Sequence, residues 1–180
     1  MVRDLVERIR QKDQRAMSQL YKMYVKRLSS VCYRYVPNEN DAKYVLQNSF
    51  VKIFTTIPTI DYQGEEAFWN WMKKVVANEA LYYLRERKRL LFVDQKLAAQ
   101  QIADVDEPQP EQLTKEELQE LISDLPDGYR TVINLHIFEG YPHKKIAELL
   151  GITESTSSSQ LYFAKRALAK RIKELLNDKQ

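Results

Sequence analysis

The sequence is poor in cysteine and glycine, with one cysteine and four glycines in 180 residues, and no apolar run approaches the ~18 residues of a membrane span. The lone Cys32 excludes an intramolecular disulfide framework, and no set of cysteines and histidines has the spacing of a zinc site. The scarcity of glycine argues against a β-rich fold, and the charged start "MVRDLVERIRQKDQ" is unlike a signal peptide. We expect an all-α chain in the reduced cytoplasm, without membrane insertion, metal or cofactor.

Apolar and charged residues are plentiful, and the charges are unevenly distributed. Hydrophobic residues make up 44% of the chain, which predicts packed cores rather than disorder. Residues 1–89 carry 17 Lys and Arg against 10 Asp and Glu (+7), residues 90–112 carry 1 against 5 (−4), and residues 113–180 carry 10 against 10. A basic front half fits phosphate as a partner about as well as it fits a solvated surface.

Apolar residues in the front half recur at three- and four-residue spacing, which predicts three amphipathic helices. We expect the first to end before Pro37 and the second to be capped at Asn40 or Asp41. The segment "PTIDYQGEE" then forms a loop. Of the two tryptophans on the third helix, Trp71 is the better core candidate, which leaves Trp69 for the linker or a partner. The predicted ranges are 16–35, 38–57 and 65–90.

A change of composition divides the chain into two small helical domains. Residues 94–113 are acidic and rich in glutamine, and Pro108 and Pro110 favour extended backbone, so they form the predicted linker between domain 1–93 and domain 114–180. Thr114 and Glu117 have the spacing of a capping box at the start of the second domain. A second helix is expected over "LPDGYRTVINLHIFEGY", closing before the glycine.

The stretch "PHKKIAELLGITESTSSSQLYFAKRAL" has the parts of a helix-turn-helix. A short helix from Pro142 would end at Gly151 in a left-handed stop, and Thr153 would cap a second helix. In DNA-binding versions the first residues of that second helix enter the major groove, where hydroxyls bond phosphates or base edges and Gln160 can pair with adenine. A helix pair packed only against protein is the alternative. The inner stripe of the second helix is expected at Leu161, Ala164, Leu168, Ile172 and Leu175.

Taken together, these segments resemble an extracytoplasmic-function sigma factor, from the small two-domain class of the main bacterial sigma family. "NDAKYVLQNSFVKIF" and "FWNWMKKVVANEALYYLRERKR" resemble region 2, and "LISDLPDGYRTVINLHIFEGYPHKKIAELLGITESTSSSQLYFAKRAL" resembles region 4. The resemblance covers residues 13–172 and implies a region 2 bundle joined by the acidic linker to a region 4 helix-turn-helix. It implies a non-catalytic subunit that binds core RNA polymerase, directs it to promoter DNA and helps to separate the strands.

The resemblance also assigns residues to the polymerase contact. Family members grip the largest catalytic subunit with the region 2 helix, where this chain has Asp41, Gln47, Asn48 and Phe50. Phe50 fits the core as well as it fits the interface. Lys43, Tyr44 and Asn48 stand where acidic residues are common in the family, so the grip relies less on charge. An anti-sigma factor is a further partner that the family implies, although nothing in the sequence identifies one.

Contacts with the minus-ten element follow from the same resemblance. The loop 59–66 and the front of the third helix correspond to the pocket that receives an unstacked base, whose extrusion costs a few kcal/mol. Tyr82, in place of a common Asp, can either stack on a base or lie buried. The positions assigned to this element are Asp61, Asn78, Tyr82, Arg85, Arg87, Lys88 and Arg89.

Contacts with the minus-thirty-five element are assigned to the second helix of the helix-turn-helix. Ser158 replaces a common Lys and Gln160 a common Arg, which predicts an altered promoter preference. The assigned positions are Thr156, Ser157, Ser158, Gln160, Lys165 and Arg166.

Two other functions fit parts of the sequence. A helix-turn-helix transcriptional regulator that binds duplex DNA without polymerase shares the C-terminal motif, but the aromatic and basic residues that end the front half favour the sigma factor. An enzyme lacks a convincing nucleophile, metal set or phosphate loop, and His136 and His143 are expected at the surface or in helix packing.

Overall fold

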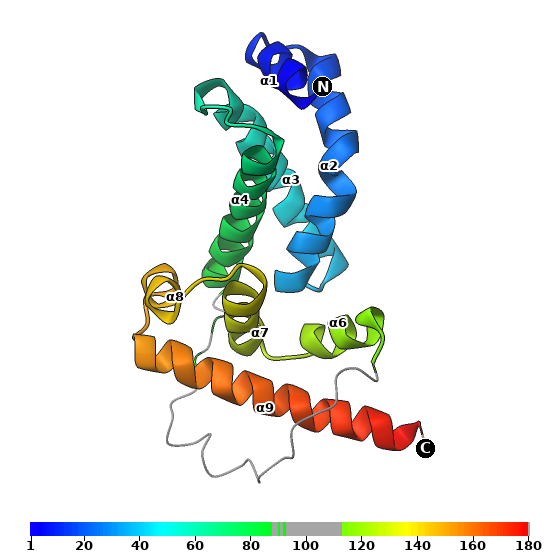
Figure 1. Cartoon of the computed structure of the whole chain (residues 1–180), viewed down its shortest axis with the longest axis vertical. Helices are drawn as coiled ribbons and strands as arrows, with labels where there is room; N and C mark the ends of the chain where they lie inside the picture. The colour runs from blue at the N-terminus through cyan, green and yellow to red at the C-terminus, as the bar shows by residue number, and fades with distance from the viewer. Residues whose placement is uncertain (88–89, 91, 93–112, 180) are drawn as a thin grey trace. The chain divides into compact units, whose positions relative to one another are not determined.

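The protein is described by a computed structural model that covers residues 1–87, 90, 92 and 113–179 (Figure 1). The described residues form helices and connecting segments, with no strand among them. They divide into two compact units, Met1–Glu86 and Arg87–Gln180. The all-helical expectation is confirmed, whereas the limits at residues 93 and 114 stay a prediction because most of the predicted linker lies outside the described residues.

Unit 1 contains four α-helices and one short 3-10 helix. The helix α1 was not predicted. The helix α2 was predicted from residue 16 and begins two residues earlier, with Asp13 as its cap. The Asp13 carboxylate accepts hydrogen bonds from the backbone N–H groups of Arg15 and Ala16 at 2.8 and 3.2 Å. The next helix is capped by Asn38, which accepts from the Asp41 N–H at 3.0 Å, so the expected cap at Asn40 or Asp41 was wrong by two or three residues. The elements are α1 (Val2–Arg10), α2 (Gln14–Tyr35), α3 (Glu39–Thr56), η1 (Ile57–Thr59) and α4 (Glu65–Glu86).

The core of unit 1 lies where α2, α3 and α4 pack against one another. Their contacting faces bury large side chains, and burying each such side chain contributes ~1.5–3 kcal/mol relative to exposure. The Cys32 Sγ lies in this core at 3.5 Å from the Ala42 carbonyl oxygen, and burial raises the pKa of the thiol to about 12. Cys32 is therefore a packing residue. The largest fully buried side chains here include Leu20, Tyr24, Leu28, Tyr35, Ile53, Ile57, Met72, Leu81 and Leu84.

Unit 2 begins with the predicted capping box, in which Thr114 and Glu117 each accept a hydrogen bond from the other's backbone N–H. The second predicted helix closes before Gly140 as expected, but its last turn is π-helical rather than α-helical. The buried Arg130 ties the start of this helix to the preceding turn by donating to the Ser123 and Leu125 carbonyls at 3.0 and 2.6 Å. The elements are α6 (Lys115–Ser123), α7 (Asp127–Ile133), η3 (Asn134–Phe138), α8 (His143–Leu150) and α9 (Glu154–Asp178).

The long helix α9 holds unit 2 together by packing against α6, α7 and α8. Two ion pairs support its far end: Arg171 lies 3.7 Å from Asp124, and Lys179 lies 2.5 Å from Glu117. No helix in the described ranges is both long and apolar enough to cross a bilayer.

Candidate nucleic-acid interface

The turn of the predicted helix-turn-helix joins α8 to α9. Gly151 ends α8 in the left-handed conformation (φ 67°, ψ 35°), and the Ile152 N–H donates to the Ala147 carbonyl at 3.1 Å. Thr153 caps α9, its hydroxyl accepting from the Thr156 N–H at 3.0 Å. The predicted turn and cap are therefore confirmed. The residues at the start of α9, Thr153 to Ser155, are exposed at the positive end of the helix dipole.

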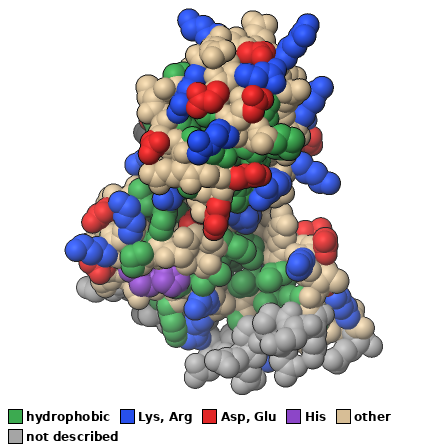
Figure 2. Space-filling view, turned by 45° about the horizontal axis from the view of Figure 1, so that its top comes forward, with side chains coloured by type: hydrophobic (Ala, Val, Ile, Leu, Met, Phe, Trp, Pro, Cys, Tyr) green, Lys and Arg blue, Asp and Glu red, His purple; other side chains and the backbone are tan. Residues whose placement is uncertain are grey.

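A polar cluster fastens the start of α8 to the start of α9. The His143 Nδ1 lies 2.9 Å from the Ser157 hydroxyl, and the His143 ring stacks on His136 with centroids 4.6 Å apart and planes 6° apart. His136 in turn has its Nδ1 2.9 Å from the Tyr141 carbonyl oxygen. Figure 2 shows the two histidines as one patch. Burial lowers the pKa of His143, and the neighbouring His136 lowers it further. The expected packing role of the histidines is confirmed.

The assigned minus-thirty-five residues fall on two different faces of α9. Ser158 and Lys165 are exposed, and Thr156 and Arg166 are partly exposed. Ser157 and Gln160, by contrast, are 0% and 1% exposed.

The burial of Ser157 and Gln160 corrects their assignment as base-reading residues. They lie on the inner face of α9, because positions 157, 160, 161 and 164 follow the three- and four-residue spacing of one helical stripe. A side chain on that stripe packs against α7 and α8 rather than entering a groove.

Sequence reasoning missed Tyr162, which lies on the exposed face of α9. Its side chain is 53% exposed, and its hydroxyl accepts a hydrogen bond from the Arg166 guanidinium at 2.6 Å. The same guanidinium lies 5.5 Å from the centre of the ring. Tyr162 follows Ser158 by four residues, so the helical spacing places both on one face and was a signal for its position.

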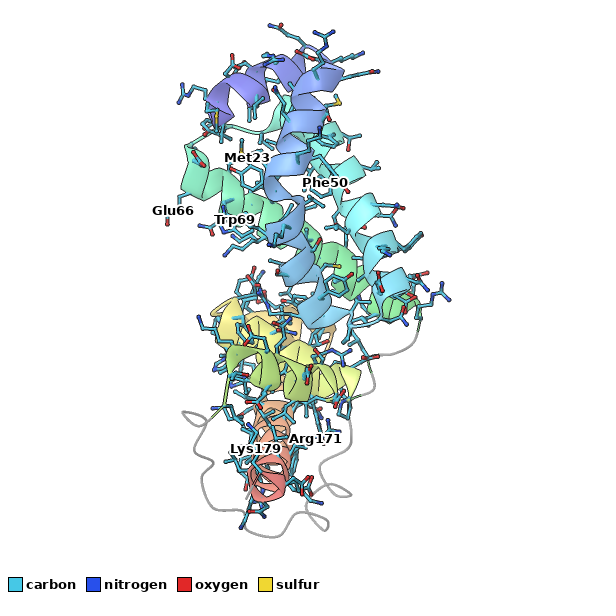
Figure 3. All side chains as sticks on the ribbon, turned by 90° about the vertical axis from the view of Figure 1, so that its right-hand side faces the viewer. Met23, Phe50, Glu66, Trp69, Arg171 and Lys179 are labelled. Atoms are coloured by element: carbon cyan, nitrogen blue, oxygen red, sulfur yellow. The ribbon has the colours of Figure 1, made fainter. Side chains whose placement is uncertain are left out.

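In unit 1, the residues assigned to polymerase binding separate into a buried and an accessible set. Phe50 is 4% exposed and packs against the rings of Tyr21 and Phe54 at 4.6 and 5.9 Å, which corrects its assignment to the interface (Figure 3). Asp41 and Asn48 are partly exposed, and Gln47 is exposed.

The accessible side of α3 also carries apolar side chains that the sequence reasoning did not assign. Tyr44 and Val51 are both exposed beside Gln47 and Asn48. Lys43, which stands where acidic residues are common in the family, forms an ion pair with Glu39 at 2.7 Å. The positive charge of Lys43 is therefore partly neutralised within the helix. The accessible side of α3 therefore combines apolar and amide side chains with the partly exposed Asp41.

The residues assigned to the minus-ten element lie on α4 and in the segments directly before and after it. Asn78, Arg85 and Arg87 are exposed, and Tyr82 is 57% exposed, which decides against the buried alternative for that ring. Its neighbour Tyr83 takes the buried position instead. Asp61 is exposed in the segment before α4, whereas Lys88 and Arg89 lie outside the described residues.

Both tryptophans of α4 are half-buried, so the expectation that Trp71 fills the core was wrong. The core position is taken by Phe68, whose ring stacks on Trp71 at 5.4 Å. Trp69 stacks on Tyr24 of α2 at 6.0 Å and lies under the Arg27 guanidinium at 4.0 Å (Figure 3). Trp69 thus joins α4 to α2 at the surface.

Comparisons with known proteins agree with this arrangement of two units. The family described as sigma-70 region 2 matches residues 20–90, and sigma-70 region 4 matches residues 115–168. The chain is 30% identical to the ECF RNA polymerase sigma-E factor of Haemophilus influenzae, over 96% of this chain and 95% of that protein. It is 25% identical to the ECF RNA polymerase sigma factor SigW of Bacillus subtilis, over 97% of this chain and 98% of SigW.

A solved structure supports the fold. The sigma factor RpoE from Bartonella quintana, in a co-crystal with the anti-sigma factor NepR, matches with a TM-score of 0.51 and 17% identity, over 87% of this chain and 96% of RpoE. The matches to both family regions, and to full-length relatives, show that this chain belongs to the ECF sigma factors of the sigma-70 family.

Proposed function

We propose that this chain is an alternative sigma factor that binds core RNA polymerase, directs it to a set of promoters and assists strand separation. The observation that carries the proposal is the presence, in family order, of a region 2 unit and a region 4 unit whose helix-turn-helix has its turn and cap intact. The chemistry of RNA synthesis is left to the core enzyme. The chain acts where the polymerase is, in the cytoplasm.

Unit 2 is proposed to read the duplex minus-thirty-five element with the exposed face of α9. Ser158, Tyr162 and Lys165 share this face in the first half of the helix. In helix-turn-helix proteins this end enters the major groove, with hydroxyls and cations on base edges and phosphates. Short side chains such as Ser158 let the helix backbone approach the groove closely. Arg166 holds the Tyr162 hydroxyl and so fixes the direction of the ring.

Unit 1 is proposed to use two surfaces. The accessible side of α3, with Gln47, Asn48 and partly exposed Asp41, is assigned to the core polymerase. The accessible side of α4 is assigned to the minus-ten element: Tyr82 offers a ring for an unstacked base, and Arg85 neutralises a phosphate. Arg87, the residue directly after the helix, is assigned to a further phosphate. Stacking on one aromatic ring returns ~1–3 kcal/mol, which is the scale of the cost of extruding a base.

An anti-sigma factor is proposed as a further partner. The Bartonella quintana RpoE structure holds the anti-sigma factor NepR. We infer that this chain is regulated by a protein of the same class, which would cover the surfaces that otherwise meet polymerase and DNA.

The proposal is tested by transcription in vitro with purified core polymerase from the same organism, on a library of promoter fragments from its genome. We expect discrete transcripts that require both the chain and the core enzyme. The test variant is Tyr44→Arg with Val51→Arg, which adds two positive charges to the accessible side of α3 and changes no residue of unit 2. This double variant should lose polymerase binding and transcription together. Tight duplex binding by the unsubstituted chain with no polymerase association would instead indicate a helix-turn-helix regulator.

A further inference from the structure

The N-terminal helix α1 contacts the segment that links α3 to α4, at the same end of unit 1 (Figure 1). Arg10, in the last turn of α1, donates from Nη2 to the Ile60 carbonyl at 2.6 Å. Its Nη1 bonds Glu7 of the same helix at 2.8 Å. The guanidinium is therefore held at one end by its own helix and at the other by a backbone carbonyl fifty residues away.

A second contact from α1 holds the same segment two residues further on. The Arg3 guanidinium lies 5.4 Å from the centre of the Tyr62 ring. Tyr62 also packs against Phe68 of α4, with ring centroids 5.7 Å apart. The segment is thus held between α1 and the buried Phe68 of α4.

The contacts alternate with exposed residues along the segment. Ile60 and Tyr62 are the held positions, whereas Asp61 and Gln63 between and after them are exposed, with Gln63 Nε2 donating to Asp61 Oδ2 at 3.3 Å. Gly64 closes the segment at φ +115°, a conformation that residues with a side chain rarely adopt. Asp61 and Gln63 therefore lie on a backbone segment that is held by α1 on one side and by Phe68 of α4 on the other.

The packing of α1 against the rest of unit 1 restricts the movement of the helix that carries Arg3 and Arg10. One face of α1 is buried against the rest of unit 1, and Arg8 pairs with Asp13 at 2.8 Å across the turn into α2. The burial removes the freedom that a terminal helix would otherwise have. The buried face consists of Val2, Leu5, Val6 and Ile9.

We propose that α1 is a positioning element for promoter recognition, in which Arg10, with Arg3, fixes residues 60–64 so that Asp61 and Gln63 meet an unstacked base of the minus-ten element. The proposal rests on the proposed function, since it assigns a role within the same minus-ten site. Arg10 touches no base and acts through the Ile60 carbonyl. Loss of its donors lets the segment sample other conformations, and a site that is loose by even one ångström loses much of its selectivity.

The test uses the full-length chain with Arg10→Met, which keeps the length of the side chain and removes its donors. Hydrogen–deuterium exchange of the free protein should become faster in residues 60–64, while α2 and the buried part of α4 keep their protection. Arg15→Met is the matched control, because Arg15 is an exposed arginine of α2 whose described contacts do not include the segment. Arg10→Lys, which keeps one cationic donor, should be intermediate. If Arg10→Met does not fold, Arg3→Gln removes only the contact with Tyr62 and should show a smaller change in the same amides.

The second measurement is base preference, from transcription by the reconstituted holoenzyme on promoters randomised over the minus-ten element. Arg10→Met should flatten the preference at one position by about fivefold or more, the lower end of what one base pair contributes, while Arg15→Met keeps it. A uniform loss on all promoters, or unchanged exchange in residues 60–64, would overturn the proposal. If the unsubstituted chain gives no transcript at all, the proposed function fails and the specificity role with it. The exchange experiment needs no polymerase and still decides whether Arg10 fixes the segment.

Discussion

Ser158 gives the sharpest test of which face of α9 meets DNA. It is exposed on that face, next to the buried Ser157, and family resemblance places a lysine at this position in many members. Substituting Ser158→Lys adds a cation at the start of α9. If this face lies in the major groove, the new ammonium reaches a phosphate, and holoenzyme binding to the promoter becomes tighter at low salt.

The size of the effect follows from counterion release. Each neutralised phosphate of duplex DNA changes the slope of log K against log salt by ~0.9. One added contact therefore makes the variant lose about 3.5-fold more affinity than the unsubstituted protein when salt rises fourfold, from ~50 to ~200 mM. Fluorescence anisotropy of a labelled promoter with holoenzyme measures both slopes directly.

Asn177→Lys is the charge-matched control, since Asn177 is exposed at the other end of the same helix. It raises the net charge equally but lies about twenty residues, or ~30 Å, along α9 from Ser158. Its slope should match that of the unsubstituted protein. Equal slopes for Ser158→Lys and Asn177→Lys would refute the placement of this face in the groove.

Three further outcomes follow from the structure of unit 2. Gln160→Ala should lower the free energy of unfolding and reduce transcription alike on all minus-thirty-five variants, because the side chain is buried; a change of base preference in the same library would restore it to the reading face. Gly151→Ala should cost about 1–2 kcal/mol in chemical denaturation, from the left-handed backbone alone, since an added Cβ meets no atom within 4 Å; Gly151→Asn should cost less. The lowered pKa of His143 means that the unfolded chain binds more protons, so the stability of unit 2 should fall as pH drops below about 6.5, and His143→Asn should flatten this dependence in denaturation at several pH values.

Features set by local chemistry were predictable from the sequence. The capping box at Thr114, the left-handed Gly151 and the cap at Thr153 each depend on a few consecutive residues, and all three were placed correctly. Two missed features had local signals. The buried positions of α1, from Val2 to Ile9, have helical spacing, and Gln160 stands four residues before Ala164 of the predicted inner stripe. Gln160 is polar, which favours an exposed position, but its helical spacing places it on the buried stripe.

The buried aromatic residues of α4 also had a local signal. Tyr82 and Tyr83 are adjacent and chemically alike, but Tyr83 follows Ala80 by three residues and so continues the buried stripe of the helix. Phe68 lies on the same stripe, four residues before Met72, whereas Trp71 lies beside it. The π-helical turn after Ile133 had no such signal: the Glu139 N–H bonds the Asn134 carbonyl five residues back, a bonding pattern to which residue propensity gives no guide.

Strand opening tests the central claim most directly, because it requires the polymerase contact, both promoter contacts and the base pocket together. Permanganate oxidises unpaired thymines, so it reports opening base by base on a promoter that the chain selects. The account predicts reactive thymines from the minus-ten element to the start site only when the chain and core polymerase are both present, and markedly fewer with Tyr82→Ala. A chain that protects the minus-thirty-five duplex by itself, and leaves every thymine paired in the presence of core polymerase, would contradict it.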